Sequence, residues 1–276
     1  TAVAQKFEAI YRKELDEKLQ KEKIDITMPG KFIPQGKVHP LTQTTNEIVD
    51  IFHSLGFSLV GNQNSPEVET EYYNFDMLNI PKDHPARDMQ DTFYCNLASN
   101  VVLRSQTSGA QIHVMEEQKP PIRIIAPGRV YRNEDVNARK NNFFHQIEGL
   151  LVDKNITMGD LKGVLNEFIR LYFGESRQTR FRSSFFPFTE PSVEIDVQCI
   201  MCGGKGCRVC SGTGWLEILG AGMVDVNVLK GVGIDPEVYS GFAFGMGVER
   251  IAMLKYEVDD IRLLYENDVR FLEQFK

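Results

Sequence analysis

A polar loop between two extended segments constrains the fold of this chain more than any other feature. Residues 128–134 and 143–152 both have the alternating pattern of strands, and the eight residues between them are Asp-Val-Asn-Ala-Arg-Lys-Asn-Asn. A connection of this length without helical periodicity favours an antiparallel hairpin. The chain is therefore expected to build antiparallel sheet around residues 128–152.

The same hairpin concentrates chemically active side chains. Because side chains alternate across a strand, Arg132 and Glu134 share one face of the first strand. The partner strand places three more on a common face: Phe144, Gln146 and Glu148. If both sets point the same way, the sheet presents a cation, two carboxylates, an amide and an aromatic ring. Such a face is typical of a ligand platform, and a solvated sheet face is the alternative.

A second candidate site follows a short apolar strand near the end of the chain. Residues 242–244 are Phe-Ala-Phe, and the strand breaks at residues 245–247 (Gly-Met-Gly) before a helix over residues 248–255 that carries Glu249 and Arg250. A strand, a glycine-rich turn and a helix start together form an anion cradle. No Gly-Lys-Ser/Thr follows, which excludes a P-loop. The arginine within the first turn strengthens the prediction.

The remaining pattern predicts a mixture of helices and strands. Amphipathic helices are expected over residues 40–55 and 158–173, with a further helix at 110–118. Short strands are expected at residues 57–60, 101–104, 122–126, 193–197 and 215–220. We therefore predict one α+β domain over residues 36–276, with a mixed, mainly antiparallel sheet flanked by helices.

The first 23 residues form a separate prediction. Apolar residues recur there at steps of three and four among Lys and Glu, which indicates an amphipathic helix; they are Val3, Phe7, Ile10, Tyr11, Leu15 and Leu19. A plain solvated helix and the end of a longer coiled-coil arm both fit. We assign residues 1–35 to the remnant of such an arm and its linker. Because the chain begins at Thr1, we expect a fragment or a processed form.

Charge and hydropathy argue against two function classes. The chain has 31 Lys and Arg against 38 Asp and Glu, a formal charge of −7 over 276 residues. This balance argues against a broad basic surface for nucleic acid but allows a narrow contact with one RNA end. The sequence holds no run of 18 apolar residues and no charged-then-apolar leader. Neither a membrane span nor a secretory signal is predicted.

Four of the five cysteines lie within twelve residues, in an insert that we assign to residues 199–214; they are Cys199, Cys202, Cys207 and Cys210. This clustering argues against a disulfide framework and fits a reducing cytosol. Two Cys-x-x-Cys pairs suit Zn²⁺ in a structural role, because four cysteines leave no open coordination position. The four-residue gap between the pairs is tight, so four free thiols in a mobile hairpin tip are the alternative.

Several of these segments together resemble a class II aminoacyl-tRNA synthetase. The helix and strand ending at Pro66 resemble the first motif of that class, residues 132–151 the second, and residues 245–250 (Gly-Met-Gly-Val-Glu-Arg) the third. From residue 36 onward the chain is more specifically similar to the family of bacterial phenylalanyl-tRNA synthetase α subunits. The strings that carry this similarity are His-Pro-Ala-Arg-Asp at 84–88, Leu-Arg-Ser-Gln-Thr-Ser at 103–108, Phe-His-Gln-Ile-Glu-Gly at 144–149, Phe-Pro-Phe-Thr-Glu-Pro-Ser at 186–192 and Gly-Phe-Ala-Phe-Gly at 241–245.

The resemblance implies that the chain activates L-phenylalanine with ATP and transfers it to the 3′ end of tRNA(Phe). Arg132 matches the family's clamp on the α-phosphate, and Arg250 matches the arginine that faces the γ-phosphate and adenine; both are implied catalytic residues. Phe144 matches the ring that stacks on adenine. Glu134 and His145 complete the implied ATP site.

The implied phenylalanine site has a polar wall and an aromatic end. Its polar residues are Gln106, Ser108, Gln146 and Glu148, and its aromatic end, where edge-to-face packing selects a phenyl ring, consists of Phe186, Phe188 and Ala243. Glu190 matches a Mg²⁺ ligand near the partner subunit, and Glu217 is a further candidate for ATP-bound Mg²⁺. Three structural alternatives stay open: core packing for the two phenylalanines, an ion pair for Arg132, and a hydrogen-bonded structural role for His145.

Partners follow from the same resemblance. It implies an α2β2 heterotetramer, in which the β subunit and the coiled coil make much of the tRNA contact. A cytoplasmic location and no membrane partner are expected. Two other functions stay open: an amino-acid adenylating paralogue that never meets tRNA, and a synthetase-like binding subunit. The presence of Arg132, Phe144, Glu148 and Arg250 argues against the second.

Overall fold

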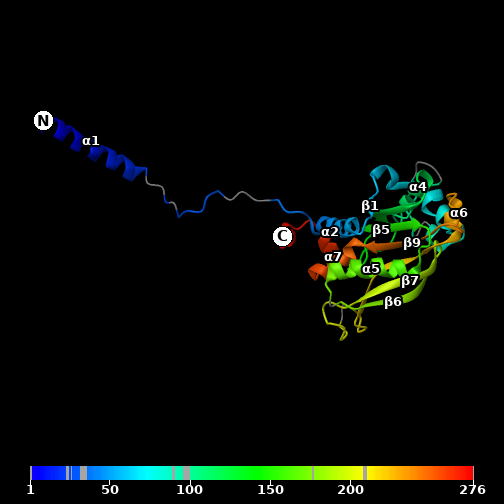
Figure 1. The fold of residues 1–276 in the computed structure, drawn as a ribbon. Helices are drawn as coiled ribbons and strands as arrows, with labels where there is room; N and C mark the ends of the chain where they lie inside the picture. Colours follow the sequence, from blue (N-terminus) through cyan, green and yellow to red (C-terminus); the bar gives the residue numbers. More distant parts are fainter. Residues whose placement is uncertain are drawn as a thin grey trace. The chain divides into compact units, whose positions relative to one another are not determined.

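The computed structural model describes residues 2–22, 25, 27–31, 36–88, 91–95, 100–175, 177–207 and 210–275. The chain divides into two compact units, residues 1–36 and 37–276. The first unit contains helix α1, Ala2–Lys21 (Figure 1), as the sequence predicts. None of its described residues is buried. The apolar positions of α1 are therefore exposed, among them Phe7 with 74% of its surface accessible.

The second unit is built on one sheet, in which the described strands run in the order β1-β4-β5-β9-β8-β7-β6 (Figure 1). Their bounds are Ser58–Leu59 (β1), Ile122–Tyr131 (β4), Phe143–Asp153 (β5), Thr179–Phe186 (β6), Thr189–Gln198 (β7), Trp215–Val224 (β8) and Ser240–Gly247 (β9). Strand β1 is parallel to β4, and the other neighbours are antiparallel. The predicted mixed, mainly antiparallel sheet is confirmed. A separate antiparallel pair joins β2 (Val68–Thr70) to β3 (Val101–Leu103).

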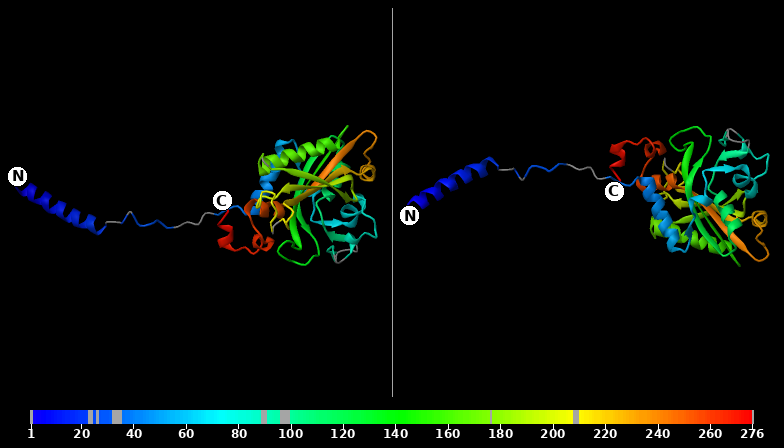
Figure 2. Two further views of the ribbon diagram at one scale, coloured as in Figure 1. Left: turned by 90° about the horizontal axis from the view of Figure 1, so that it is seen from below. Right: turned by 90° about the horizontal axis from the view of Figure 1, so that it is seen from above.

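Three helices cover one face of this sheet: α2 (Pro40–Ser54), α5 (Met158–Phe173) and α7 (Val248–Tyr256) (Figure 2). Helix α2 packs against both of the others. The ring of Phe52 on α2 stacks on Phe168 of α5 at 4.9 Å and on Phe244 of β9 at 4.8 Å, between ring centroids. These contacts form the centre of the larger hydrophobic core.

The starts of α2 and α5 follow from local sequence. Pro40 occupies the first turn of α2, where its missing N–H is not needed, and the side chain of His39 accepts the N–H of Leu41. Before α5, the side chain of Thr157 accepts the N–H of Asp160, whose carboxylate accepts the N–H of Thr157. This reciprocal capping satisfies N–H groups that have no partner inside the helix.

The opposite face of the sheet carries a second core, around Ile112, Leu150 and Ala243. The helices on this side are α3 (Glu71–Asn74), α4 (Gly109–Glu117) and α6 (Val226–Gly231). The other short elements are η1 (Asn62–Asn64), η2 (Asp76–Leu78), η3 (Pro85–Arg87), η4 (Ile261–Leu264) and α8 (Val269–Leu272). Beside the second core, the same face is hollowed into two cavities. No helix of the described chain is both long and apolar enough to cross a membrane.

Three expected strand boundaries are wrong. The sequence predicts separate strands at 122–126 and 128–134, but β4 is continuous through Pro127 and ends at Tyr131. The proline is tolerated because β1 pairs only with Ile124 and Ile125, so among the described residues β4 is an edge strand at Pro127. Strand β9 does not break at Gly245, because that residue pairs with strands on both sides.

Candidate active site

The two cavities adjoin each other, with volumes of about 370 Å³ and about 500 Å³. We call the first the aromatic lobe, because Phe186, Phe188 and Ala243 line it, and the second the polar lobe, because Arg132 and Arg250 line it. The residues that line both lobes are Arg132, Gln146, Glu217, Gly220 and Gly245. A ligand with an aromatic part and an anionic part can therefore occupy the two lobes continuously.

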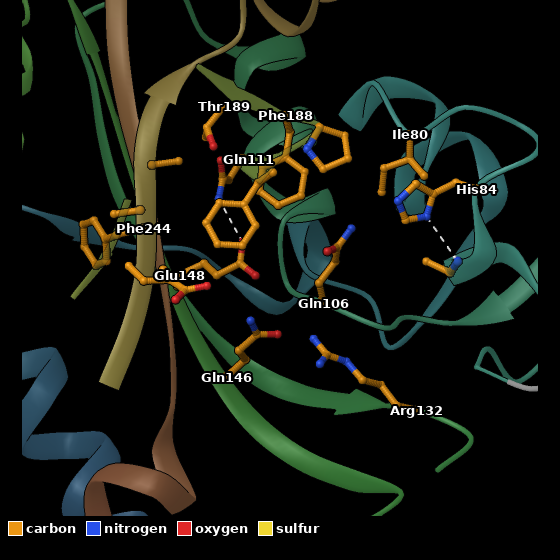
Figure 3. A pocket seen from close by; sticks show the side chains of 18 of the residues that line it. Ile80, His84, Gln106, Gln111, Arg132, Gln146, Glu148, Phe188, Thr189 and Phe244 are labelled. Carbon is orange, nitrogen blue, oxygen red and sulfur yellow. Dashed lines mark hydrogen bonds between the residues drawn. The ribbon is translucent and has the colours of Figure 1, made fainter. Parts of the chain in front are cut away.

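Two stacked rings form the wall of the aromatic lobe. The rings of Phe186 and Phe188 lie 5.9 Å apart at an angle of 14°, and Figure 3 shows Phe188 beside Thr189 at this end. Gly220 leaves room for the first ring, since a Cβ there would lie 2.7 Å from Cζ of Phe186. Ala243 lines the lobe from the floor. Both phenylalanines are thus available to a ligand and are not confined to the core.

A buried carboxylate lies on the floor of the aromatic lobe. Oε2 of Glu148 accepts hydrogen bonds from Oγ of Ser108 at 2.6 Å and from Nε2 of Gln111 at 3.0 Å. Burial raises the pKa of the Glu148 carboxyl, although the hydrogen bond from Ser108 and the charge of Arg132 oppose this. The cavity thus offers an acceptor whose charged form an ammonium group would stabilise.

Two side-chain amides and one guanidinium lie near the Glu148 carboxylate. Gln106, Gln146 and Arg132 surround the same part of the cavity in Figure 3. The side-chain oxygen of Gln146 is buried and has no hydrogen-bond partner among the described residues. Ser108 does not line the cavity and contributes through its bond to Glu148. An unpaired buried acceptor is costly, and a bound donor would satisfy it.

Arg132 connects the two lobes. Its guanidinium lies 5.0 Å from the centre of the Phe144 ring, and its Nε donates to the carbonyl of Ser105 at 3.2 Å. Burial lowers the pKa of Arg132, and Glu134 and Glu148 oppose this. Beyond the end of β4 the chain turns, with the N–H of Glu134 donating to the carbonyl of Arg132. Arg132 and Glu134 therefore line the same lobe through a turn, not through the strand alternation that the sequence predicts.

The polar lobe is rich in cations: Arg132, Arg139, Lys140 and Arg250. Of the acidic residues that line it, Glu134 pairs with Lys140 at 3.1 Å, and Glu249 is bonded to His145. The ring of Phe144 lies beside these cations and offers a flat apolar surface. This combination suits a polyphosphate joined to a planar base.

His145 lies outside both lobes. Strand alternation turns it to the other face of β5, where its Nδ1 lies 2.7 Å from Oε1 of Glu249 and its ring lines a different cavity with His39 and Tyr265. The resemblance implies a place in the ATP site, whereas the geometry gives His145 a position directly behind it.

The two candidate magnesium ligands are in different surroundings. Glu217 lines both lobes, with 57% of its side chain accessible and Nη2 of Arg182 at 3.4 Å. Burial and the nearby charge of Glu194 raise the pKa of Glu217. Glu190 is exposed on β7 and does not line either lobe. Of these two glutamates, Glu217 is therefore the one that lies at the polar lobe.

The four cysteines of the insert form a compact cluster between β7 and β8. Their Sγ atoms all lie within 4.8 Å of one another, and Cys199 and Cys210 are buried. Four thiolates complete the tetrahedral coordination of a zinc ion, so no further ligand is needed. The donor set therefore fits Zn²⁺.

Some lining residues are not predicted from the sequence. In the aromatic lobe they include His84, Gln111, Thr189 and Glu194, and in the polar lobe Arg139, Lys140 and Asn141. Gln111 lies one helical turn beyond Ser108, which is a signal that could have found it. For Arg139 and Lys140 in the loop 135–142, the sequence gives no signal beyond their positive charge.

Comparison with known proteins agrees with this geometry. Residues 23–275 match the family model described as tRNA synthetases class II core domain (F). The pyrrolysyl-tRNA synthetase of Desulfitobacterium hafniense shares the fold, with a TM-score of 0.62 and 18% identity over 84% of this chain and 75% of that one. The fold and the two-lobed site thus define a class II aminoacyl-tRNA synthetase core.

Curated relatives narrow the assignment. The phenylalanine–tRNA ligase alpha subunit of Caldanaerobacter subterraneus subsp. tengcongensis is 61% identical over 96% of this chain and 76% of its own length. The protein of the same name from Gloeobacter violaceus is 60% identical over 94% of this chain and 75% of its own length. The chain belongs to the phenylalanine–tRNA ligase alpha-subunit family, which confirms the resemblance found in the sequence.

Proposed function

We propose that this chain activates L-phenylalanine with ATP to give phenylalanyl-adenylate and pyrophosphate, and then transfers the phenylalanyl group to the 3′ end of tRNA(Phe) with release of AMP. The observation that carries the proposal is the junction of an aromatic cavity with a cationic cavity at Arg132 and Gln146. At such a junction, the carboxylate of an aromatic amino acid and the α-phosphate of ATP meet beside one guanidinium.

The amino acid occupies the aromatic lobe. Its ring packs against Phe186, Phe188 and Ala243, and its ammonium group binds the carboxylate of Glu148 and the unpaired oxygen of Gln146. Ser108 holds Glu148, and Gln106 lies on the polar wall. A carboxylate oxygen then attacks the α-phosphorus, and pyrophosphate leaves.

ATP occupies the polar lobe. Its adenine stacks on Phe144, Arg132 neutralises the charge that develops at the α-phosphate, and Arg250 binds the γ-phosphate. Glu134 contributes to the same site, and His145 supports it from the other face of β5. Positioning and charge neutralisation supply most of the catalysis, because forming a mixed anhydride needs little proton transfer.

Magnesium and zinc complete the proposal. Carboxylate oxygens are ligands that Mg²⁺ prefers, and Glu217, which lines the polar lobe, would hold the ion that neutralises the phosphates. We assign Glu190 to a Mg²⁺ near the partner subunit. Cys199, Cys202, Cys207 and Cys210 hold a structural Zn²⁺.

The proposed assembly is a cytoplasmic α2β2 heterotetramer with the synthetase β subunit. Residues 36–276 form the catalytic domain with its cysteine-rich insert, and residues 1–35 are the end of a coiled-coil arm that contacts tRNA. The net negative body is compatible with this substrate, because the catalytic domain receives only the 3′ end.

Phenylalanine-dependent exchange of pyrophosphate into ATP tests the function, measured with the β subunit present and repeated with tRNA(Phe). Exchange together with charging of tRNA(Phe) is the expected result, with tyrosine as the matched amino-acid control. Exchange without charging would favour an adenylating paralogue, and a folded complex without exchange would favour a binding subunit.

A further inference from the structure

Three of the six Sγ–Sγ distances in the insert match those of a tetrahedral metal site, and all six lie within 4.8 Å. The Sγ–Sγ distances are 3.8 Å for Cys199–Cys207, 3.9 Å for Cys202–Cys210 and 3.7 Å for Cys207–Cys210. Four sulfurs at about 2.3 Å from one tetrahedral ion lie about 3.8 Å apart. A disulfide would need about 2.05 Å. The cluster therefore matches one metal ion and not two disulfides.

Backbone donors surround two of these sulfurs. The N–H of Gly206 donates to Sγ of Cys202 at 3.2 Å, and the N–H groups of Cys207 and Gly214 donate to Sγ of Cys210 at 3.1 and 3.2 Å. Hydrogen bonds to sulfur favour the thiolate, which is the form that binds metal.

Glycines allow the loop to close this tightly. Gly206 and Gly214 have φ values of +93° and +78°. A Cβ at Gly206 would lie 2.6 Å from the carbonyl oxygen of Gly212, and a Cβ at Gly214 would lie 2.3 Å from that of Gly204. Both the backbone conformation and the close approach require glycine.

The cluster is continuous with the folded body. Cys199 and Cys210 are buried at 0% and 4% exposure within the larger core, whereas Cys202 and Cys207 are half-buried at its edge. A metal held by all four would join the tip of the hairpin to that core.

The register of β7 and β8 connects the cysteine cluster to Glu217 in the candidate active site. The N–H of Cys199 donates to the carbonyl of Gly214 at 2.8 Å, and the next pairs along β7 and β8 end with Asp196 opposite Glu217. Ile195 then pairs with Leu219, so one residue of β8 bulges beside Glu217. A bulge re-aims the neighbouring side chain, and Glu217 is the acidic residue that faces both lobes.

We propose that one zinc ion bound by the four cysteines fixes the register of the β7–β8 hairpin and thereby positions Glu217 at the junction of the lobes. None of the four cysteines lines either lobe, so they are positioning residues. The link to catalysis rests on the proposed function, whereas the metal site and the register do not.

Metal content tests the first part on the α subunit in complex with its β subunit, purified without chelator. We expect about one zinc per chain, and loss of it in Cys202→Ser and Cys207→Ser. Cys95→Ser, a cysteine outside the cluster, is the matched control and retains the metal. Cobalt substitution should give the absorption of tetrahedral thiolate coordination. Less than about 0.1 zinc per chain with four reactive thiols, or iron in place of zinc, would overturn the assignment.

Hydrogen exchange and kinetics test the second part. In Cys202→Ser, the amides of residues 215–219 should exchange faster, while those of β5 are unchanged. The Mg²⁺ concentration needed for half-maximal pyrophosphate exchange should rise about tenfold, with the KM for phenylalanine within about twofold of wild type. Unchanged exchange at residues 215–219, or an equal rise in both kinetic constants, would overturn the positioning role. If the wild type shows no phenylalanine-dependent activity, the proposed function fails, and metal content and hydrogen exchange still decide this proposal.

Discussion

The Nδ1 atom of His145 lies 2.7 Å from Oε1 of Glu249, on the face of β5 that is turned away from the aromatic lobe. The same carboxylate accepts the backbone N–H of His145 at 2.9 and 3.0 Å and a hydrogen bond from the hydroxyl of Tyr265. Glu249 immediately precedes Arg250, and His145 lies between Phe144 and Gln146. One buried carboxylate therefore fixes β5, which carries Phe144, relative to α7, which carries Arg250.

Glu249→Gln should weaken ATP binding more than phenylalanine binding. The amide cannot accept all of these donors as a carboxylate does, and each hydrogen bond to a charged group contributes about 1.5–3 kcal/mol. We expect the KM for ATP to rise at least tenfold and the melting temperature to fall, with the KM for phenylalanine changed less than threefold. Pyrophosphate exchange and thermal unfolding measure both effects. Glu266→Gln, an exposed residue beside Tyr265, should change neither.

Arg132→Ala should abolish activation while leaving the fold intact. The guanidinium stacks on Phe144 and makes one hydrogen bond to a carbonyl, so its loss affects stability little. Removing a preorganised charge from a developing phosphoryl charge costs about 3 kcal/mol or more, or roughly a hundredfold in rate. Arg132→Lys should recover only part of the rate, because lysine lacks the planar fork. Exchange at the wild-type rate in the alanine variant, measured beside Arg270→Ala as an exposed control, would show that Arg132 has no such role.

Strand periodicity predicted which side chains of residues 143–152 share the face that lines the cavities. The alternation in residues 143–152 already placed Phe144, Gln146 and Glu148 on one face, and the structure brings all three to the cavities. The same alternation turns His145 to the other face of β5, where it lines a different cavity. Alternation is a local property of the backbone and needs no tertiary information.

Features that depend on distant neighbours were harder to predict. Whether β4 continues through Pro127 depends on where β1 ends, and β1 lies more than sixty residues earlier in the chain. Arg139 and Lys140 lie in a loop, where sequence periodicity does not indicate which way a side chain points. They line the polar lobe because the loop of the β4–β5 hairpin lies beside it. The tight four-residue gap between the two Cys-x-x-Cys pairs left the geometry of the cluster open in the sequence, and glycines in the left-handed region let the loop close.

Phenylalanine binding should weaken as the pH falls through the pKa of Glu148. Burial raises this pKa, so the unliganded carboxyl takes up a proton at higher pH than an ordinary glutamate. The neutral acid cannot pair with the ammonium group, and binding in that range should release a proton. The effect on stability has the opposite sign. The folded protein binds this proton more tightly than the unfolded chain does, so the free energy of unfolding declines as the pH rises from the ordinary pKa of a glutamate toward the raised pKa of Glu148.

Calorimetry in buffers of different ionisation enthalpy measures the proton release at Glu148. Glu148→Gln should bind phenylalanine weakly at every pH and release no proton, whereas Glu237→Gln, an exposed control, should behave as wild type. A pH dependence that persists in Glu148→Gln would assign the titration to another group.

Ala243→Gly should admit para-chloro-phenylalanine while keeping activity on phenylalanine. Ala243 lines the aromatic lobe from β9 and belongs to the second core, whereas its neighbours Phe242 and Phe244 pack into the larger core on the other face. We expect its methyl group to limit the depth available to a para substituent. Steric exclusion must carry much of the discrimination against tyrosine, because an apolar pocket rejects an added hydroxyl by only about a hundredfold.

The cost of this change should be modest. Glycine in a strand loses roughly 0.5–1 kcal/mol relative to alanine, so the variant should remain folded. Ala126→Gly is the matched control: Ala126 is also buried in a strand, but it does not line either lobe. It should show a similar loss of stability and no activity toward the analogue. Adenylation of both amino acids, measured with the β subunit present, distinguishes the two variants. An Ala243→Gly protein that is folded and active on phenylalanine yet gains nothing toward the analogue would mean that Ala243 does not form the end of the pocket, and the substrate ring would then have to lie elsewhere in the aromatic lobe.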